Sequence, residues 1–283
     1  DFFGVDAVRY FVLHEMPFDN DGVISWELMV ERLNSDLANI LGNLVNRTIS
    51  MTNKYFDGVV RNAGVTEDVD ADLKAVVLDE VKKINDKMDQ LRVADAITEI
   101  FNIFRRCNKY IDETMPWALA KDEAKKDRLA TVLYNLVEAI TIGASLLEAF
   151  MPETSEKILA QLQTEKRELS AMDQFGLYPD GGKVTDKPEI LFARMDLKEV
   201  MEKVEAMRAA EAPKEEKKEE PEEAVIDIEA KPEITYDDFA KLQFQVGEII
   251  ACEAVKKSKK LLCSQVKIGS QVKQIVSGIK AHY

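Results

Sequence analysis

The sequence predicts a mainly α-helical protein, in which an antiparallel helical bundle is followed by an acidic linker and part of a small β-barrel. Three observations favour this fold class. Apolar residues recur at spacings of three and four over most of residues 31–165, which is the period of amphipathic helices. The chain is 46% hydrophobic but only 7% aromatic, a composition more typical of helices than of a β-sandwich. After Pro232 the pattern changes to short β-like runs.

The helices are predicted from this period together with start and stop signals. A short helix (6–14) is followed by a loop (17–22) that contains proline and glycine. Ser25 is placed to cap the start of the next helix. Further helices are predicted at about 33–55, 67–91, 93–112, 122–149 and 153–163, and Pro152 separates the last two. The short loops between them indicate antiparallel neighbours.

The second part of the chain is first irregular, then highly charged, then β-like. Residues 166–200 lack a regular period, and 201–232 are rich in lysine, glutamate and proline, as expected for a solvated linker whose start can be helical. Strand-like runs follow at 244–250, 265–268 and 272–276. Three strands make only part of a five-stranded oligonucleotide-binding barrel (OB-fold), so we expect the sequence to stop before that barrel closes.

Charge is unevenly distributed along the chain. The net charge of −14 argues on average against nucleic-acid binding. However, residues 200–232 contain eleven acidic and six basic side chains, whereas residues 254–283 contain seven lysines and no acid. Local charge decides what contacts a phosphate backbone, so the C-terminal segment is a candidate for binding RNA.

Cysteine and histidine usage argues against metal and disulfide chemistry. Cys107, Cys252 and Cys263 are far apart and form no C-x-x-C pair, which favours ordinary buried or half-buried thiols in a reducing cytosol. His14 and His282 are too isolated to support a site. The sequence shows no signal peptide and no uninterrupted apolar stretch of about 18 residues, so we expect a cytoplasmic protein without a membrane partner.

Asn39, Asn43 and Arg47 are candidates for recognising nucleotide bases. Spaced four residues apart, they follow one side of a helix at about 6 Å per step, with Asn46 and Ser50 nearby. Amide and guanidinium groups offer the paired hydrogen bonds that base edges require. The alternative is a polar stripe facing solvent, which the spacing alone favours.

Two further candidates are a tryptophan and a lysine run. Trp117 follows Pro116 at a predicted helix start, where it either anchors the core or, if exposed, stacks on a base. Lys256, Lys257, Lys259 and Lys260 form either a solvated loop or a set of phosphate contacts without sequence specificity. Lys267, Lys273 and Lys280 extend that set if they share a strand face.

Two separated segments resemble the methionyl-tRNA synthetases. The first comprises DAVRY (6–10), FDNDG (18–22), NSDLANILGNLVNR (34–47), YFDG (55–58) and PW (116–117), with a weaker match at KPEILFAR (187–194). The second comprises FAKL (239–242), VGEI (246–249) and QIVSGI (274–279), and is similar to the tRNA-binding domain appended to many bacterial members. Ala193 and Gln245 depart from the proline and the arginine that are common in the family.

The resemblance implies roles for the candidate residues. The family residues that match Asn43 and Arg47 contact the first anticodon base, the match of Asn39 belongs to the same surface, and the match of Trp117 stacks on that base. The implied partner is tRNA(Met), recognised through its CAU anticodon, and the lysine run then contacts the tRNA backbone. In the family the appended barrel also mediates homodimerisation. DNA is not an implied partner.

The resemblance also implies what the chain lacks. The two ATP-handling signatures of the family, H-I-G-H and K-M-S-K-S, and its zinc-binding knuckle do not occur in the sequence. We therefore expect no cofactor and no catalytic residue in this chain, with ATP and any zinc confined to a missing catalytic part of a methionine–tRNA ligase. The expected division is 1–30 on the side of the catalytic and stem-contact region, 31–165 as the anticodon-binding bundle, 166–200 as an irregular segment packing on it, 201–232 as the linker, and 233–283 as the partial OB-fold.

Two alternatives of other classes stay open at this point. A stand-alone tRNA-binding or carrier protein would use the same barrel without an enzymatic parent. A helical scaffold with an acidic interaction tail would bind no RNA, and it gives no reason for the asparagine–arginine stripe.

Overall fold

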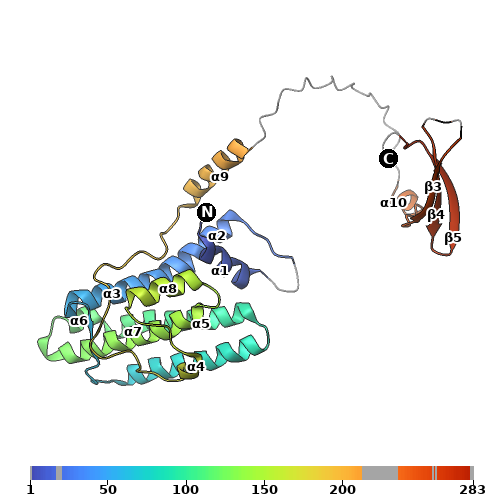
Figure 1. The fold of residues 1–283 in the computed structure, drawn as a ribbon. Coiled ribbons are helices and arrows are strands. Elements are labelled where there is room, and N and C mark those ends of the chain that lie inside the picture. Colours follow the sequence, from blue (N-terminus) through green and yellow to red (C-terminus); the bar gives the residue numbers. More distant parts are fainter. Residues whose placement is uncertain (1, 17–20, 212–234, 257, 259, 281–283) are drawn as a thin grey trace. The chain divides into compact units, whose positions relative to one another are not determined.

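The structure is a computed structural model that describes residues 2–16, 21–211, 235–256, 258 and 260–280. Contacts divide the chain into two compact units, residues 1–214 and 215–283, and each is described by itself below. The first unit is helical, and the second contains a small antiparallel sheet (Figure 1). The predicted mainly helical fold with a small β region is confirmed.

The first unit is built around two long helices, α5 (Val93–Thr114) and α7 (Lys126–Leu147), which pack on each other. The other elements are α1 (Val5–Glu15), α2 (Trp26–Arg32), η1 (Leu33–Gly42), α3 (Asn43–Phe56), β1 (Val59–Val60), α4 (Asp68–Asp89), α6 (Pro116–Leu119), η2 (Glu123–Lys125), α8 (Pro152–Gln161), η3 (Leu169–Ala171), β2 (Gly182–Lys183) and α9 (Leu197–Glu211). The predicted helices are present to within a few residues, and the Ser25 side chain caps α2 by accepting from the Leu28 N–H.

Helix α7 is the centre of the core. Its residues from Arg128 to Leu147 are all buried. Gly143 allows the close approach of α5, because a Cβ there would lie 2.5 Å from the ring of Phe104. Among the described helices, the stretch Glu123–Leu147 is the one long and apolar enough to cross a membrane, but its apolar window lies wholly inside the bundle, as in a core helix.

Asp70, at the start of α4, is the centre of a buried polar cluster. Its carboxylate receives hydrogen bonds from the Arg128 guanidinium (3.1 Å), the Asn135 amide (3.2 Å) and the Tyr110 hydroxyl, and Asp70 is 1% exposed. The Glu67 N–H also donates to it, at 2.6 Å. Burial, together with the Asp70 carboxylate, raises the pKa of Tyr110, so its hydroxyl stays a donor. The cluster joins α4, α5 and α7.

A second buried carboxylate, Glu138 on α7, holds the irregular segment that follows α8. Both Nη atoms of Arg167 donate to it at 2.9 Å. The backbone N–H groups of Gly176, Leu177 and Tyr178 donate to the same carboxylate at 2.7–3.1 Å. Glu138 is therefore buried but fully paired, and it anchors a segment that has little regular structure of its own.

The rod of helix predicted at 33–55 is present, but it is not uniform. Its first part, η1, is a π-helix with i→i+5 hydrogen bonds, and only from Asn43 does it continue as the α-helix α3. Leu33, Leu37 and Leu44 are buried, as the apolar period predicts. A π-helix and an α-helix both place these residues toward the core, so the apolar period does not show which of the two helix types is present.

Helix α9 begins inside the irregular segment and extends to Glu211, into the range predicted as linker. Val200 and Val204, one turn apart on α9, are buried against Val30 of α2. These two residues supply the apolar contact that makes this stretch helical and packed. Residues 212–234, most of the predicted linker, lie outside the described residues.

The second unit contains the sheet β3–β4–β5. Strands β3 (Glu248–Ala254), β4 (Leu262–Ile268) and β5 (Gln271–Ser277) are antiparallel neighbours in that order, and a short helix, α10 (Tyr236–Phe239), precedes them. The register of β3 shifts between Ile249 and Ala251. Every residue of β3 is exposed. Cys252 on this strand is thus exposed, contrary to the expectation of a buried or half-buried thiol, because few of the side chains that the structure describes cover β3.

The Asp70 cluster leads to a prediction about stability. Asp70→Asn leaves the buried Arg128 guanidinium with only the exposed Glu67 carboxylate, at 3.3 Å, as a charged partner, so we expect the free energy of unfolding to fall by about 3 kcal/mol. Urea unfolding followed by helical circular dichroism measures it. Asp79→Asn is the matched control, because it removes an acid of the same helix that pairs with Lys83 at the surface and should cost less than about 1 kcal/mol. Equal losses for the two variants would contradict the assigned role.

The cysteines differ in expected reactivity. Burial raises the pKa of Cys107 to about 12, so at pH 8 this thiol stays protonated, whereas Cys252 is exposed. We expect iodoacetamide at pH 8 to alkylate Cys252 in the folded chain and to reach Cys107 only after unfolding, as seen by peptide mass spectrometry. Equal labelling of both in the folded chain would show that α5 opens far more readily than its packing implies.

Candidate functional site

Asn39, Asn43 and Arg47 lie along one side of the rod formed by η1 and α3. Asn39 is half-buried near the end of the π-helix, and Asn43 and Arg47 are exposed on the first turns of α3. The Asn43 Nδ2 atom is 3.5 Å from Asn39 Oδ1, a long hydrogen bond. The two amides are therefore neighbours across the junction of the two helix types, with most of their hydrogen-bonding capacity unused by this contact.

Arg47 links this side of the rod to the end of α5. Its Nη2 atom is 4.0 Å from Asp112 Oδ1, and the side chains are 44% and 72% exposed. An ion pair so long and so exposed contributes little to stability. It shows, however, that the last turns of α5 lie beside the side of the rod that carries Asn39, Asn43 and Arg47.

Trp117 follows closely after Asp112 in the sequence. Helix α5 ends where Met115 adopts a left-handed conformation (φ 44°), and α6 begins at Pro116. Pro116 is buried, whereas Trp117 is 43% exposed. Pro116 therefore fills the anchoring position, and the indole is available at the surface, as a stacking platform requires.

An irregular strap, residues 185–195, runs beside the same rod in the opposite direction. Three contacts fix it: Thr185 and Met195 accept hydrogen bonds from the amides of Asn53 and Asn34 (both 2.8 Å), and the Phe192 backbone lies close to Gly42. The strap borders the rod that carries the candidate residues. Sequence reasoning placed this segment near the bundle but gave no contact for it.

The lysine run lies in the second unit, between β3 and β4. Lys256 and Lys260 are exposed, and Lys257 and Lys259 lie outside the described residues. Lys267 pairs with Val272, and Val266 with Lys273, across β4 and β5. Because neighbouring residues of a strand point to opposite faces, Lys267 and Lys273 do not share a face and do not extend one patch together.

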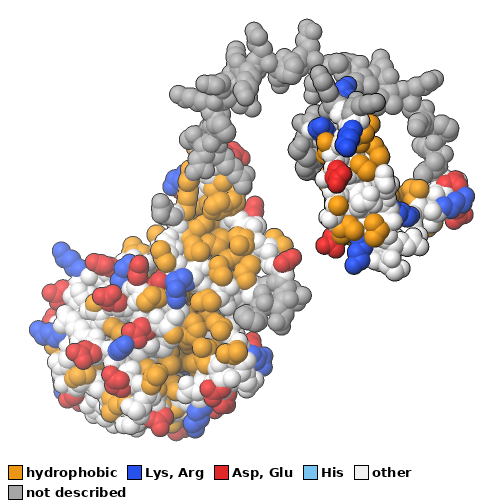
Figure 2. All heavy atoms as spheres, turned by 45° about the vertical axis from the view of Figure 1, so that its right-hand side comes forward, with side chains coloured by type: hydrophobic (Ala, Val, Ile, Leu, Met, Phe, Trp, Pro, Cys, Tyr) orange, Lys and Arg blue, Asp and Glu red, His pale blue; other side chains and the backbone are white. Residues whose placement is uncertain are grey.

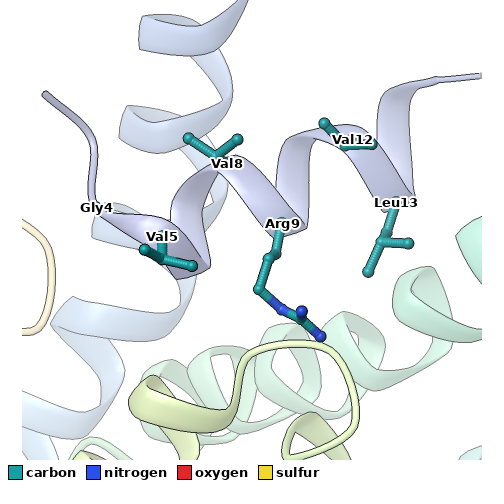
Figure 3. A pocket seen from close by; sticks show the side chains of 6 residues that line it. All are labelled: Gly4, Val5, Val8, Arg9, Val12 and Leu13. Carbon is teal, nitrogen blue, oxygen red and sulfur yellow. The ribbon is translucent and has the colours of Figure 1, made fainter. Parts of the chain in front are cut away.

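The outer face of α1 is a feature that sequence reasoning missed. Val5, Val8 and Val12 recur at helical spacing, and all three are at least 43% exposed. They line an open pocket of about 500 Å³ with Gly4, Arg9 and Leu13 (Figure 3). Figure 2 shows apolar side chains gathered on one side of the first unit and on the sheet of the second. The spacing was visible in the sequence, but only the structure shows that nothing described covers this face.

The fold and the exposed side chains define a class of protein. A helical bundle that presents amides and a guanidinium along η1 and α3, and an indole on α6, has the groups by which proteins recognise single-stranded nucleic acid. Comparison with protein families agrees. Residues 60–212 match the anticodon binding domain of methionyl tRNA ligase, residues 1–49 the class I tRNA synthetases (M), and residues 244–283 a tRNA binding domain.

Individual relatives show the same arrangement. The methionine–tRNA ligases of Clostridium perfringens and Caldanaerobacter subterraneus are 41% and 44% identical over 99% and 100% of this chain, which covers 42% and 43% of their lengths. The crystal structure of apo methionyl-tRNA synthetase of Mycobacterium tuberculosis is similar with a TM-score of 0.64 and 37% identity, over 69% of this chain and 39% of that one. A second structure of that protein, bound by methionyl-adenylate, gives a TM-score of 0.63, also with 37% identity, over 68% of this chain and 38% of that one.

The chain belongs to the family of the anticodon binding domain of methionyl tRNA ligases, and the predicted resemblance is confirmed. It spans about two fifths of the length of the curated relatives that it matches.

Proposed function

We propose that this chain recognises tRNA(Met) for a methionine–tRNA ligase, with the α3 side of the bundle binding the CAU anticodon and the second unit binding the tRNA backbone. The observation that carries the proposal is the exposure of Asn43 and Arg47 on α3 and of Trp117 on α6, which directly follows the end of α5 that Arg47 contacts through Asp112. The family matches of both units support it.

The polar groups are poised to exchange their present contacts for RNA. The Asn39–Asn43 hydrogen bond is long and the Arg47–Asp112 pair is weak, so both can be given up at little cost. The freed amide and guanidinium groups then bind base edges with paired hydrogen bonds. The Trp117 ring offers a face for stacking, which contributes about 1–3 kcal/mol per base.

The second unit supplies affinity without sequence preference. Lys256 and Lys260 are exposed in the connection between β3 and β4, where they can neutralise phosphates. Joining such a site to the bundle in one chain raises its effective concentration on the same tRNA. We assign the sheet to an incomplete OB-fold barrel, and its exposed apolar residues, such as Ile249 and Val272, to closure of that barrel and homodimerisation.

On this proposal, amino-acid activation is carried out by the part of such ligases that this chain does not cover. The ATP signatures do not occur in this sequence, so the chain alone is expected to be inactive and to hold no cofactor. The apolar outer face of α1 lies within the range that matches the class I synthetases, and we assign it to contact with the catalytic part. Such an enzyme works in the cytoplasm.

The anticodon assignment is tested with two tRNA transcripts that differ only in CAU against a scrambled triplet, at about 150 mM salt. Wild type should bind the CAU transcript more tightly, and Trp117→Ala should lower that preference about tenfold, because without the indole the stacked base is no longer held against the groups of α3 that read it. Trp26→Ala is the matched control, because this other tryptophan stacks on Phe3, near α1. Equal binding of both transcripts by wild type would remove Asn39, Asn43, Arg47 and Trp117 from the proposed site.

The lysine assignment predicts a different signature. Lys256→Gln combined with Lys260→Gln should weaken both transcripts alike and reduce the slope of log affinity against log salt by about 1–2. Lys241→Gln is the control within the same unit, because Lys241 pairs with Asp238 at 2.7 Å. A double variant that changed only CAU binding, or left the salt slope unaltered, would contradict a backbone role.

A further inference from the structure

The junction between the π-helix and α3 lies inside the proposed anticodon site. Asn39 belongs to η1, Asn43 is the first residue of α3, and the Asn43 N–H donates to the Ala38 carbonyl across five residues. A change from i→i+5 to i→i+4 bonding alters the carbonyls available to the following N–H groups. Whether this junction is kept therefore decides how the side chains of Asn39 and Asn43 are placed relative to each other.

Asn108 of α5 contacts this junction directly. Its Nδ2 atom donates to the Ile40 carbonyl at 2.9 Å, and Ile40 lies between Asn39 and Asn43. The same amide nitrogen donates to the Phe104 carbonyl of its own helix at 3.1 Å. The bond to Phe104 thus fixes the Asn108 side chain on its own helix, while the bond to Ile40 holds the rod. Asn108 is half-buried, and losing a hydrogen bond in such a place is costly.

The strap, residues 185–195, also holds the rod formed by η1 and α3. A Cβ at Gly42 would lie 3.2 Å from the Leu37 carbonyl and 3.9 Å from the Phe192 backbone, so the rod and the strap approach closely at the last residue of η1. Asn34 exchanges two hydrogen bonds with Met195, one at 2.8 Å and one at 2.9 Å. The π-helix is therefore held along its length by the strap and at its junction by Asn108.

We propose that Asn108 is a positioning residue for anticodon specificity: by donating to the Ile40 carbonyl it keeps the π-to-α junction that places Asn39 and Asn43 for the bases. Asn108 does not itself contact RNA on this account. The inference rests on the proposed function of the site, and it adds a residue for which neither the sequence pattern nor the exposure of the stripe gave a signal.

The test compares Asn108→Ala and Asn108→Asp with Asn102→Ala and Asn102→Asp. Asn102 lies on the same helix and donates to Glu99 of that helix, so the control changes the same chemical groups away from the junction. The Asp variant keeps the shape of the side chain and removes both donors, which separates the hydrogen bond from packing. Each variant is measured for binding to the CAU and scrambled transcripts, for thermal unfolding, and for amide hydrogen exchange at Asn43.

In both Asn108 variants the preference for the CAU transcript should fall about tenfold, while binding of the scrambled transcript stays unchanged. The backbone N–H of Asn43 should exchange faster than in wild type. Both Asn102 variants should behave as wild type. If wild type prefers CAU and the Asn108 variants keep that preference, or lose it with unchanged exchange at Asn43, the positioning role is wrong while the proposed function stands. If wild type itself shows no preference, the proposed function fails and the specificity role falls with it. Should Asn108→Asp unfold, the uncharged Asn108→Ala decides.

Discussion

The buried pair of Asp70 and Arg128 is the interaction on which the arrangement of the bundle depends. Removing two charges from water costs several kcal/mol per ion, and that cost is offset only when every lone pair and proton finds a partner. Here the partners come from three helices: Asp70 from α4, Tyr110 from α5, and Arg128 and Asn135 from α7. The cluster is satisfied only when these helices have one relative position, so it specifies a packing that apolar contacts alone would leave less defined.

This constraint reaches the proposed site through α5. Tyr110, which belongs to the cluster, lies between Asn108, which holds the Ile40 carbonyl, and Asp112, which contacts Arg47. Arg106, a turn earlier, is tied to Asp72 of α4 at 2.7 Å. The last turns of α5 therefore have one side fixed by the buried side chains of Tyr110 and Arg106 and the other side in contact with the rod. A site composed of exposed groups gains its geometry from this buried framework.

Features that depend on neighbouring residues are predictable from the sequence, whereas features that depend on residues far apart in the chain are not. The helices follow from a local apolar period, and they were predicted to within a few residues. The π-to-α junction was not, because both helix types place Leu37 and Leu44 inward and the deciding contact comes from Asn108, 68 residues away. The burial of Asp70 and Glu138 was missed for the same reason, since their partners lie up to 65 and 40 residues distant. The exposure of Trp117 depends on the left-handed turn at Met115, for which a methionine gives no signal.

The uneven charge of the chain fits a division of labour between specificity and affinity. A unit that must distinguish one triplet from others gains little from lysines, because phosphate contacts favour every RNA equally. Neutral amides instead reject a wrong base by leaving a polar group unpaired, a penalty comparable to that of an unmade buried hydrogen bond. A stacking ring accepts any base and adds affinity for the base that it holds. On the proposed function, Asp112 beside Arg47 adds to this discrimination, because its carboxylate repels the phosphates of an RNA that makes no base contacts there. On the proposed function, the sequence-independent attraction resides in the lysines of the second unit, where it strengthens binding without relaxing the discrimination proposed for α3.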